Sequence, residues 1–231
     1  FGTFYAPNIT PDPETGIGRW RVEDVVRALR EGMRPDGQPY FPAFPYPAYS
    51  GLTDADARAI ATWLLAQPAV RQAVPDHELP WYLFTRWVML GWNFLNFTPG
   101  TFTVAADRSP AWNRGAYLVR HLGHCAECHT PRDRLGGLDR ARELAGTAAG
   151  PDGDVVPNVT PHPDGIGSWT ADDIVTFLEI GMLPDGDFAG SSMSAVIDDN
   201  TSQLTPADRA AIAAYLQSLP PVPSAPRPAA D

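Results

Sequence analysis

The sequence contains no lysine, and this absence removes several kinds of chemistry. All 17 basic residues among its 231 are arginines. A Schiff base on a lysine amine is therefore excluded, and so is the lysine of a phosphate-binding loop. Basic charge as a whole is scarce, because 27 acidic residues give a formal net charge of −10. Since a protein that binds nucleic acid must neutralise phosphates with basic side chains, we expect no nucleic-acid partner.

The sequence also lacks an uninterrupted apolar run of 18 residues, the length that predicts a membrane-spanning helix. The closest segment, Trp81 to Phe97, is rich in aromatic residues but contains Arg86 and two asparagines. We interpret it as a strap packed over the folded modules, with contact to a partner or a membrane surface as the alternative. The chain begins at Phe1 without a leader, so we expect a removed signal peptide or an incomplete chain.

Only two cysteines are present, Cys125 and Cys128, and His129 follows them directly. A disulfide across so short a loop would stabilise little. A zinc site would need a second pair of ligands, and a redox dithiol would need a βαβ context, and the sequence shows neither. The three residues fit Cys-x-x-Cys-His, the attachment pattern of haem c. We therefore predict that the two thiols hold the porphyrin and that His129 binds the iron.

The most informative feature of the sequence is an internal repeat, in which matching segments are 149 residues apart. The matching segments are 7–20 with 157–169, 21–37 with 170–186 and, after a three-residue length difference, 52–68 with 204–220. Self-similarity over such lengths indicates two related modules. We expect module 1 over residues 1–70, an aromatic-rich connector over 71–107, module 2 over 108–221 and a Pro-rich tail over 222–231.

The repeated segments have helical rather than strand periodicity, and no convincing strand pattern occurs elsewhere. Val25, Val26 and Leu29 follow helical spacing, and the same pattern extends to Met33 and its counterpart Met182. Helix starts are predicted at Thr53, at Ser109 with Pro110, at Thr170 with Asp173, and at Thr205. The helix from Ser109 is expected to run to the cysteine motif. The sequence therefore predicts an all-α fold with short helices and long loops rich in proline and glycine.

Module 1 has no attachment motif in this chain, because the repeat offset places that motif before residue 1. Module 1 nevertheless keeps the haem-side segment, including Pro7, Asn8 and Trp20. We therefore expect one haem c attached in module 2 and a second haem in module 1 of the complete protein.

Beyond the attachment motif, module 2 resembles the class I cytochrome c family. In that family a Pro-Asn-Leu-like loop, a tryptophan and a distal methionine follow the proximal histidine, and here Pro157-Asn158-Val159, Trp169 and Met193 occur in the same order. The resemblance implies that the Pro157 carbonyl accepts the Nδ1 proton of His129. It further implies that Trp169 donates to a haem propionate, with plain core packing as the alternative. It also implies that Met193, in a loop of small residues, binds the iron opposite His129. Asn158 belongs to the same haem-side loop, with a plain turn residue as the alternative.

Several other residues bear on the predicted site. Arg132 is expected to pair with a propionate, the alternative being a solvated charge, and His124 is expected to lie at the surface or behind the ligands. Met182 rivals Met193 as the iron ligand, but its place on a predicted apolar helix face favours packing. In module 1, Phe44 takes the position of Met193, so the first haem would be five-coordinate or use another residue such as Met33.

The whole chain resembles the multihaem c-type cytochrome subunits of periplasmic, membrane-bound dehydrogenases. These include the partners of quinoprotein alcohol dehydrogenases and of molybdenum aldehyde or isoquinoline-type dehydrogenases. The resemblance rests on residues 1–20, 34–49 and 112–133. It implies a periplasmic electron-transfer subunit, not a catalytic one, that relays electrons from a dehydrogenase to a quinone or a terminal oxidase. The alternative is a dihaem peroxidase or thiosulfate-oxidising cytochrome with an open haem site in module 1, and a haem-based sensor is a weaker third.

Overall fold

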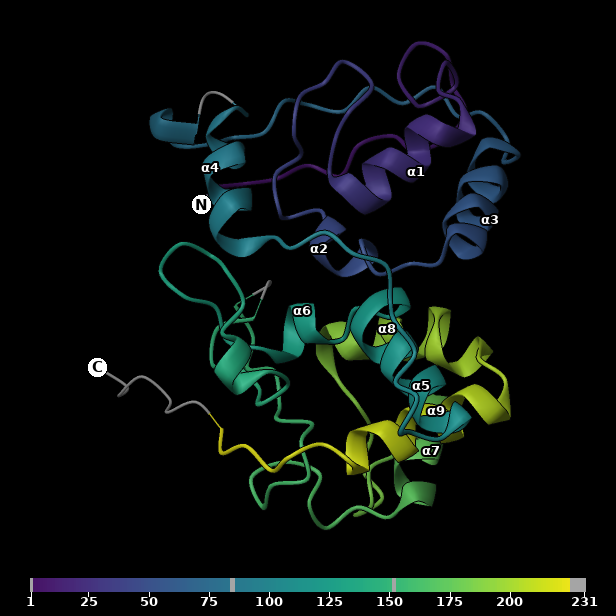
Figure 1. Cartoon of the computed structure of the whole chain (residues 1–231), viewed down its shortest axis with the longest axis vertical. Coiled ribbons are helices and arrows are strands. Elements are labelled where there is room, and N and C mark those ends of the chain that lie inside the picture. Colours follow the sequence, from purple (N-terminus) through teal and green to yellow (C-terminus); the bar gives the residue numbers. More distant parts are fainter. Residues whose placement is uncertain (1, 84–85, 151–152, 225–231) are drawn as a thin grey trace. The chain divides into compact units, whose positions relative to one another are not determined.

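The computed structural model describes residues 2–83, 86–150 and 153–224, and it divides the chain into two compact units, Phe1–Phe102 and Thr103–Asp231. The division falls inside the predicted connector, so that residues 71–102 cluster with unit 1. Within the described residues the regular elements are helices, and extended pairing is limited to isolated bridges. The prediction of an all-α fold is confirmed (Figure 1).

Unit 1 is built around two helices that lie side by side, α1 (Val22–Glu31) and α3 (Asp54–Leu65) (Figure 1). Its remaining elements are the short α2 (Tyr46–Tyr49), the 3₁₀ turn η1 (Trp81–Leu83) and α4 (Val88–Asn96). The core between α1 and α3 contains Ile17, Val25, Leu29 and Ala61. These include the positions that gave the helical periodicity, so burial of the apolar face accounts for this pairing.

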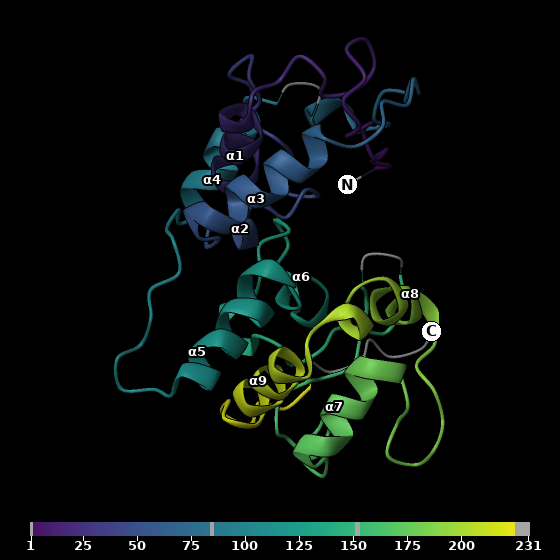
Figure 2. The same cartoon turned by 90° about the vertical axis from the view of Figure 1, so that its right-hand side faces the viewer.

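Unit 2 contains α5 (Pro110–Tyr117), the π-helical turn η2 (Leu118–Leu122), α6 (Ala126–His129), η3 (Arg140–Arg142), α7 (Ala171–Ile180), α8 (Ser191–Asp199), η4 (Thr201–Gln203) and α9 (Pro206–Gln217). Helix α9 packs against both α5 and α7 (Figure 2). Gly115 of α5 lies against α9, where an added Cβ would lie 2.0 Å from the Ala211 carbonyl oxygen. Glycine is therefore required for this approach.

The four predicted helix starts are confirmed. The side-chain oxygens of Thr53, Ser109, Thr170 and Thr205 accept hydrogen bonds from the backbone N–H groups of Asp56, Trp112, Asp173 and Asp208. Each bond satisfies one of the donors that a helix leaves without an internal partner. Thr170 and Asp173 form the predicted capping box.

The helix from Ser109 does not run unbroken to the cysteine motif. Helix α5 passes into the π-helical turn η2, which ends at Leu122, and the motif forms the separate short helix α6. A π-helical turn shifts the register of the side chains that follow it.

The prediction that Met33 and Met182 lie on helix faces is wrong. Helices α1 and α7 end at Glu31 and Ile180, because Gly32 (φ 64°) and Gly181 (φ 76°) adopt the left-handed conformation. Each methionine follows its glycine and pairs across an isolated bridge, Met33 with Pro39 and Met182 with Phe188. Met182 is 37% exposed, so packing does not account for it.

The predicted loop around Met193 is also wrong, because these residues form helix α8. Gly190 precedes the helix in an extended conformation, and serine, alanine, valine and isoleucine then continue it. Small residues are compatible with a helix, so their abundance did not distinguish the two states. Across the described ranges, no helix combines the length and apolar character that crossing a bilayer requires.

Candidate functional site

The cysteine motif forms one tight turn. Cys125 precedes helix α6, and its carbonyl oxygen accepts hydrogen bonds from the backbone N–H groups of Cys128 (3.3 Å) and His129 (3.0 Å). The two cysteines are not joined in a disulfide. Within the described residues, no group of three or more His, Cys, Asp or Glu side chains is placed to hold a metal ion.

The environment of Cys125 also argues against a redox dithiol. Burial raises the pKa of the Cys125 thiol to about 11, because a thiolate would lose its hydration. Reactive cysteines in redox proteins instead have a lowered pKa that stabilises the thiolate. The motif therefore presents a protonated thiol at Cys125 and an exposed one at Cys128.

The imidazole of His129 has a defined orientation. Its Nδ1 lies 2.8 Å from the carbonyl oxygen of Pro157, the contact that the family resemblance implied. Because a carbonyl can only accept, Nδ1 carries the proton, and Nε2 keeps its lone pair for a metal. Burial lowers the pKa of His129 and so favours the neutral ring that binds metals. Two thiols outside any disulfide and an oriented imidazole within five residues fit haem c.

The backbone around His129 is held by two residues that the sequence did not single out. The carbonyl of His129 accepts from the N–H of Gly146 (2.7 Å), and a Cβ on Gly146 would lie 2.6 Å from the Asn158 nitrogen. Gly146 also has a φ of 77°, which favours glycine. The buried hydroxyl of Thr130 accepts from the N–H of Leu144 (3.0 Å). The sequence signal for this role was the presence of a glycine in the loop after the motif. Its contact with His129 depends on tertiary structure and could not be predicted from that signal.

Asn158 is buried and its amide is bonded to the protein. Its Oδ1 accepts from the backbone N–H of Thr160 (2.8 Å), and its Nδ2 donates to the carbonyl of Val222 (2.7 Å). A further contact at 3.3 Å reaches the Ser224 hydroxyl. The side chain therefore ties the loop that contains Pro157 to the first residues of the predicted tail, whose remainder, 225–231, lies outside the described residues.

Arg132 is also bonded to protein groups. Its Nη2 donates to the Glu127 carboxylate (2.6 Å) and its Nη1 donates to the Gly136 carbonyl (2.9 Å). The arginine therefore closes the turn that follows the cysteine motif, and its alternative as a free solvated charge is not observed. These bonds occupy donors that the predicted propionate contact would share.

The remaining predicted residues lie in three different parts of unit 2. Trp169 is half-buried just before α7, and its ring centroid lies 5.4 Å from that of Phe177. Met193 is half-buried in the first turn of α8. His124 has a positive φ of 41° directly before the motif, and burial lowers the pKa of its imidazole.

Comparisons with known proteins agree with this geometry. A family model described as cytochrome c matches residues 113–220. The chain is 43% identical to a dihaem c-type cytochrome of Cereibacter sphaeroides over 95% of its own length and 73% of that protein. It is 39% identical both to a subunit of the nicotinate dehydrogenase of Pseudomonas putida and to the cytochrome c subunit of the quinone alcohol dehydrogenase of Gluconobacter oxydans. The chain covers 95% and 96% of its own length in these two alignments, but spans only 18% and 48% of the two relatives.

Proposed function

The chain belongs to the cytochrome c family, and on that premise we propose that it relays electrons from a dehydrogenase catalytic subunit to a quinone or a terminal oxidase. Electron transfer through covalently bound haem c is the function that follows from this membership. The donor is inferred from relatives named as subunits of nicotinate and alcohol dehydrogenases. The peroxidase alternative is not favoured, because these relatives are named as subunits of dehydrogenases.

The observation that carries this proposal is the contact of His129 with Pro157 beside two thiols that form no disulfide. We assign Cys125 and Cys128 to covalent attachment of the porphyrin and the Nε2 of His129 to the iron. Bound haem supplies a one-electron carrier. The Pro157 carbonyl fixes the imidazole so that the ligand atom does not rotate away, and the bond makes the ring a stronger donor.

Met193 is proposed as the second iron ligand, and ligation by a thioether and an imidazole together would raise the reduction potential of the bound haem. Trp169 is proposed to donate its indole N–H to a propionate, and Arg132 to add a second donor there. For Asn158, its bonds to Thr160 and Val222 favour a positioning role, in which it holds the Pro157 loop beneath His129.

The assignment of Met193 is tested by comparing Met193→Ala with Met182→Ala in the haem-loaded chain. Loss of a sulfur ligand in the first variant is expected to shift the visible spectrum toward high spin and to lower the reduction potential. The Met182 variant is expected to retain both properties. A low-spin spectrum that survives the first change but not the second would transfer the ligand role to Met182.

The relay is tested on the natural complex, purified through the full-length cytochrome. A quinoprotein or molybdoprotein catalytic subunit is expected to copurify, and its substrate is expected to reduce the haem. A haem that stays oxidised while the catalytic subunit turns over would contradict the relay. Peroxide consumption with a reduced donor would instead favour the enzymatic alternative.

We place the protein in the periplasm, because covalent haem attachment takes place on the outer side of the bacterial cytoplasmic membrane.

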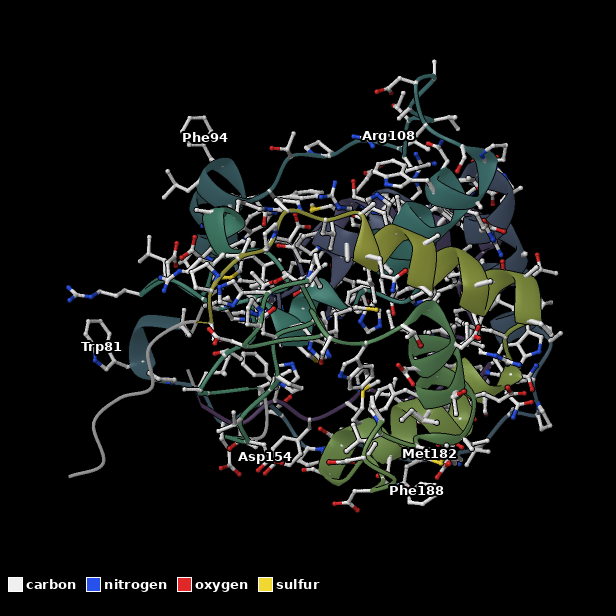
Figure 3. All side chains as sticks on the ribbon, turned by 90° about the horizontal axis from the view of Figure 1, so that it is seen from below. Trp81, Phe94, Arg108, Asp154, Met182 and Phe188 are labelled. Carbon is white, nitrogen blue, oxygen red and sulfur yellow. The ribbon has the colours of Figure 1, made fainter. Side chains whose placement is uncertain are left out.

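Within the segment Trp81–Phe97, of which residues 84 and 85 lie outside the described part, helix α4 also favours contact with a membrane surface. Leu90, Phe94 and Leu95 are 47%, 88% and 66% exposed on this helix, and Phe94 projects away from it (Figure 3). Exposed aromatic and aliphatic side chains insert into the boundary between headgroups and acyl chains.

Flotation with liposomes tests this contact. A Phe94→Ser/Leu95→Ser variant is expected to lose most of its binding to neutral phosphatidylcholine vesicles. The control is Val104→Ser, which removes an equally exposed apolar side chain (66%) in unit 2. Equal binding by the wild type and both variants would exclude membrane contact through this helix and favour the strap or a protein partner instead.

A further inference from the structure

The negative charge of the chain is concentrated in one part of unit 2. Residues 143–208 contain 12 acidic residues and no arginine, whereas the rest of the chain contains 15 acidic residues and 17 arginines. The net charge of −10 therefore arises entirely within this stretch. Such an asymmetry produces a local negative potential that steers oppositely charged partners toward one side of a protein.

Part of this stretch folds into a compact surface element that connects α7 to α8. After the helix end at Gly181, Met182 pairs with Phe188 across an isolated bridge, and the N–H of Ala189 donates to the Gly181 carbonyl (2.8 Å). Ile197 of α8 is buried and faces Gly181. The hairpin and α8 therefore form one surface, residues 182–199, which we call the acidic face.

Apolar side chains are exposed on the acidic face. Phe188 is 59% exposed, Val196 44% and Met182 37%. Met182 and Phe188 lie close together at one edge, and Asp154 lies along that same edge (Figure 3). The hydroxyl of Ser191, at the start of α8, is hydrogen-bonded to the Asp154 carboxylate. An exposed apolar cluster rimmed by polar groups is typical of a protein–protein contact.

The carboxylates on this face are not neutralised. Asp185, Asp187, Asp198 and Asp199 are exposed, and none of them forms an ion pair with another described residue. By contrast, Glu179, which precedes the face, pairs with Arg209 at 2.8 Å. Surface carboxylates without an ion pair can attract a basic protein, and this attraction raises the rate of association.

We propose that the acidic face is the docking surface for a redox protein whose own contact surface is basic. The proposal rests on the electron-relay function and identifies the chemistry of one of its partners. Arginine or lysine side chains of the partner would pair with Asp185, Asp187, Asp198 and Asp199, while its apolar centre covers Phe188 and Val196. Met193 lies in the same helix as Val196, so a partner docked here approaches the proposed iron ligand.

The electrostatic part is tested by stopped-flow oxidation of the reduced, haem-loaded chain. The variant Asp185→Asn/Asp187→Asn is compared with Asp107→Asn/Asp172→Asn, which removes the same charge elsewhere in unit 2; Asp172 lies at the opposite end of α7. One oxidant is a lysine-rich mitochondrial-type cytochrome c, and the other is the small anion ferricyanide. At low ionic strength the first variant is expected to react roughly three- to tenfold more slowly with the basic protein.

Three results separate the outcomes. The slowing is expected to disappear at high salt, and ferricyanide is expected to react no more slowly than with the wild type, because repulsion is reduced. Equal slowing in both variants would show an effect of net charge alone and would overturn the acidic face. A haem that neither oxidant reoxidises would instead contradict the proposed electron-transfer function, and the face with it.

The apolar part is tested with Phe188→Ser, with Val104→Ser as its control. The Phe188 variant is expected to slow electron transfer to the basic protein several-fold while leaving the ferricyanide rate and the visible spectrum unchanged. The control is expected to retain both rates. A shifted haem spectrum in the Phe188 variant would place this ring against the haem and overturn its role in docking.

Discussion

The two units share one loop anchor, down to individual hydrogen bonds. In unit 1, Asn8 accepts from the N–H of Thr10 (3.0 Å) and donates to the carbonyl of Val70 (2.7 Å). In unit 2, Asn158 makes the equivalent pair of bonds. Both therefore tie the loop to the segment that follows the equivalent helix, α3 in unit 1 and α9 in unit 2, and this part of the repeat has a structural role.

The units differ at the position aligned with the proposed iron ligand. Phe44 packs into the core of unit 1, with ring centroids 5.2 Å from Tyr40 and 5.8 Å from Tyr49. Met193 is half-buried on α8 in unit 2. The repeat has kept the loop anchor while this position serves core packing in one unit and presents a thioether in the other. The use of Met33 by a first haem stays a prediction.

The largest effect is expected at the attachment motif, which only unit 2 contains in this chain. Cys125→Ala/Cys128→Ala is expected to remove all covalently held haem, because unit 1 has no cysteine in this chain. Extraction with acid and acetone, followed by haem quantification, measures the loss. Phe44→Met, at the aligned position of unit 1, is the control and is expected to retain the pigment. Pigment that resists extraction from the double variant would refute the assignment.

The next largest effect is a difference in stability between alanine substitutions at two helical glycines, one in each unit. Gly115→Ala is expected to destabilise unit 2 by about 3 kcal/mol, because its Cβ would collide with the Ala211 backbone. Gly91→Ala in α4 is expected to stabilise unit 1 by about 0.5–1 kcal/mol, since no described atom beyond its own stretch of helix lies within 4 Å of the added carbon. Urea unfolding followed by circular dichroism measures both. Similar effects of the two substitutions would show that α5 and α9 do not pack this closely.

A smaller effect on stability is expected when the two loop anchors, Asn8 and Asn158, are removed in turn. Asn158→Ala is expected to cost about 2–3 kcal/mol, and Asn8→Ala about 1 kcal/mol, because Asn158 is buried and Asn8 is only half-buried. Hydrogen exchange at Thr10 and Thr160 would report the two losses separately. Equal losses in the two variants would mean that burial of the anchor does not determine its contribution.

The smallest effect concerns pH and an ion pair that joins α5 to α9. Hydrogen bonds from Arg114 hold the pKa of Asp208 below its ordinary value of 3.8. A lowered folded-state pKa stabilises the protein above the unfolded pKa, and this contribution is lost as pH falls below about 4. Urea unfolding at about pH 5 and pH 3 is expected to show a loss below about 1 kcal/mol. Asp208→Asn is expected to remove that loss, and an unchanged pH dependence in the variant would assign it to other carboxylates.

The sequence determined the features that depend on neighbouring residues. Helix starts at Thr53 and Thr205 follow from a side chain and a backbone group three positions apart, and the Cys-x-x-Cys-His spacing is itself the attachment pattern. The internal repeat showed which helices of the two modules correspond to each other. Resemblance to a family, rather than spacing, supplied the contact between His129 and Pro157.

Tertiary structure alone decided where chain segments far apart in sequence meet. Gly146 lies beneath Pro157, Asn158 holds Val222 across 64 positions, and Gly115 admits the backbone of α9, because long-range packing selects glycine or a buried amide without leaving a local pattern. The helical state of the residues around Met193 was also set there. Helical propensities differ by less than about 1 kcal/mol between most residues, so contacts with the rest of the unit determine which conformation is adopted.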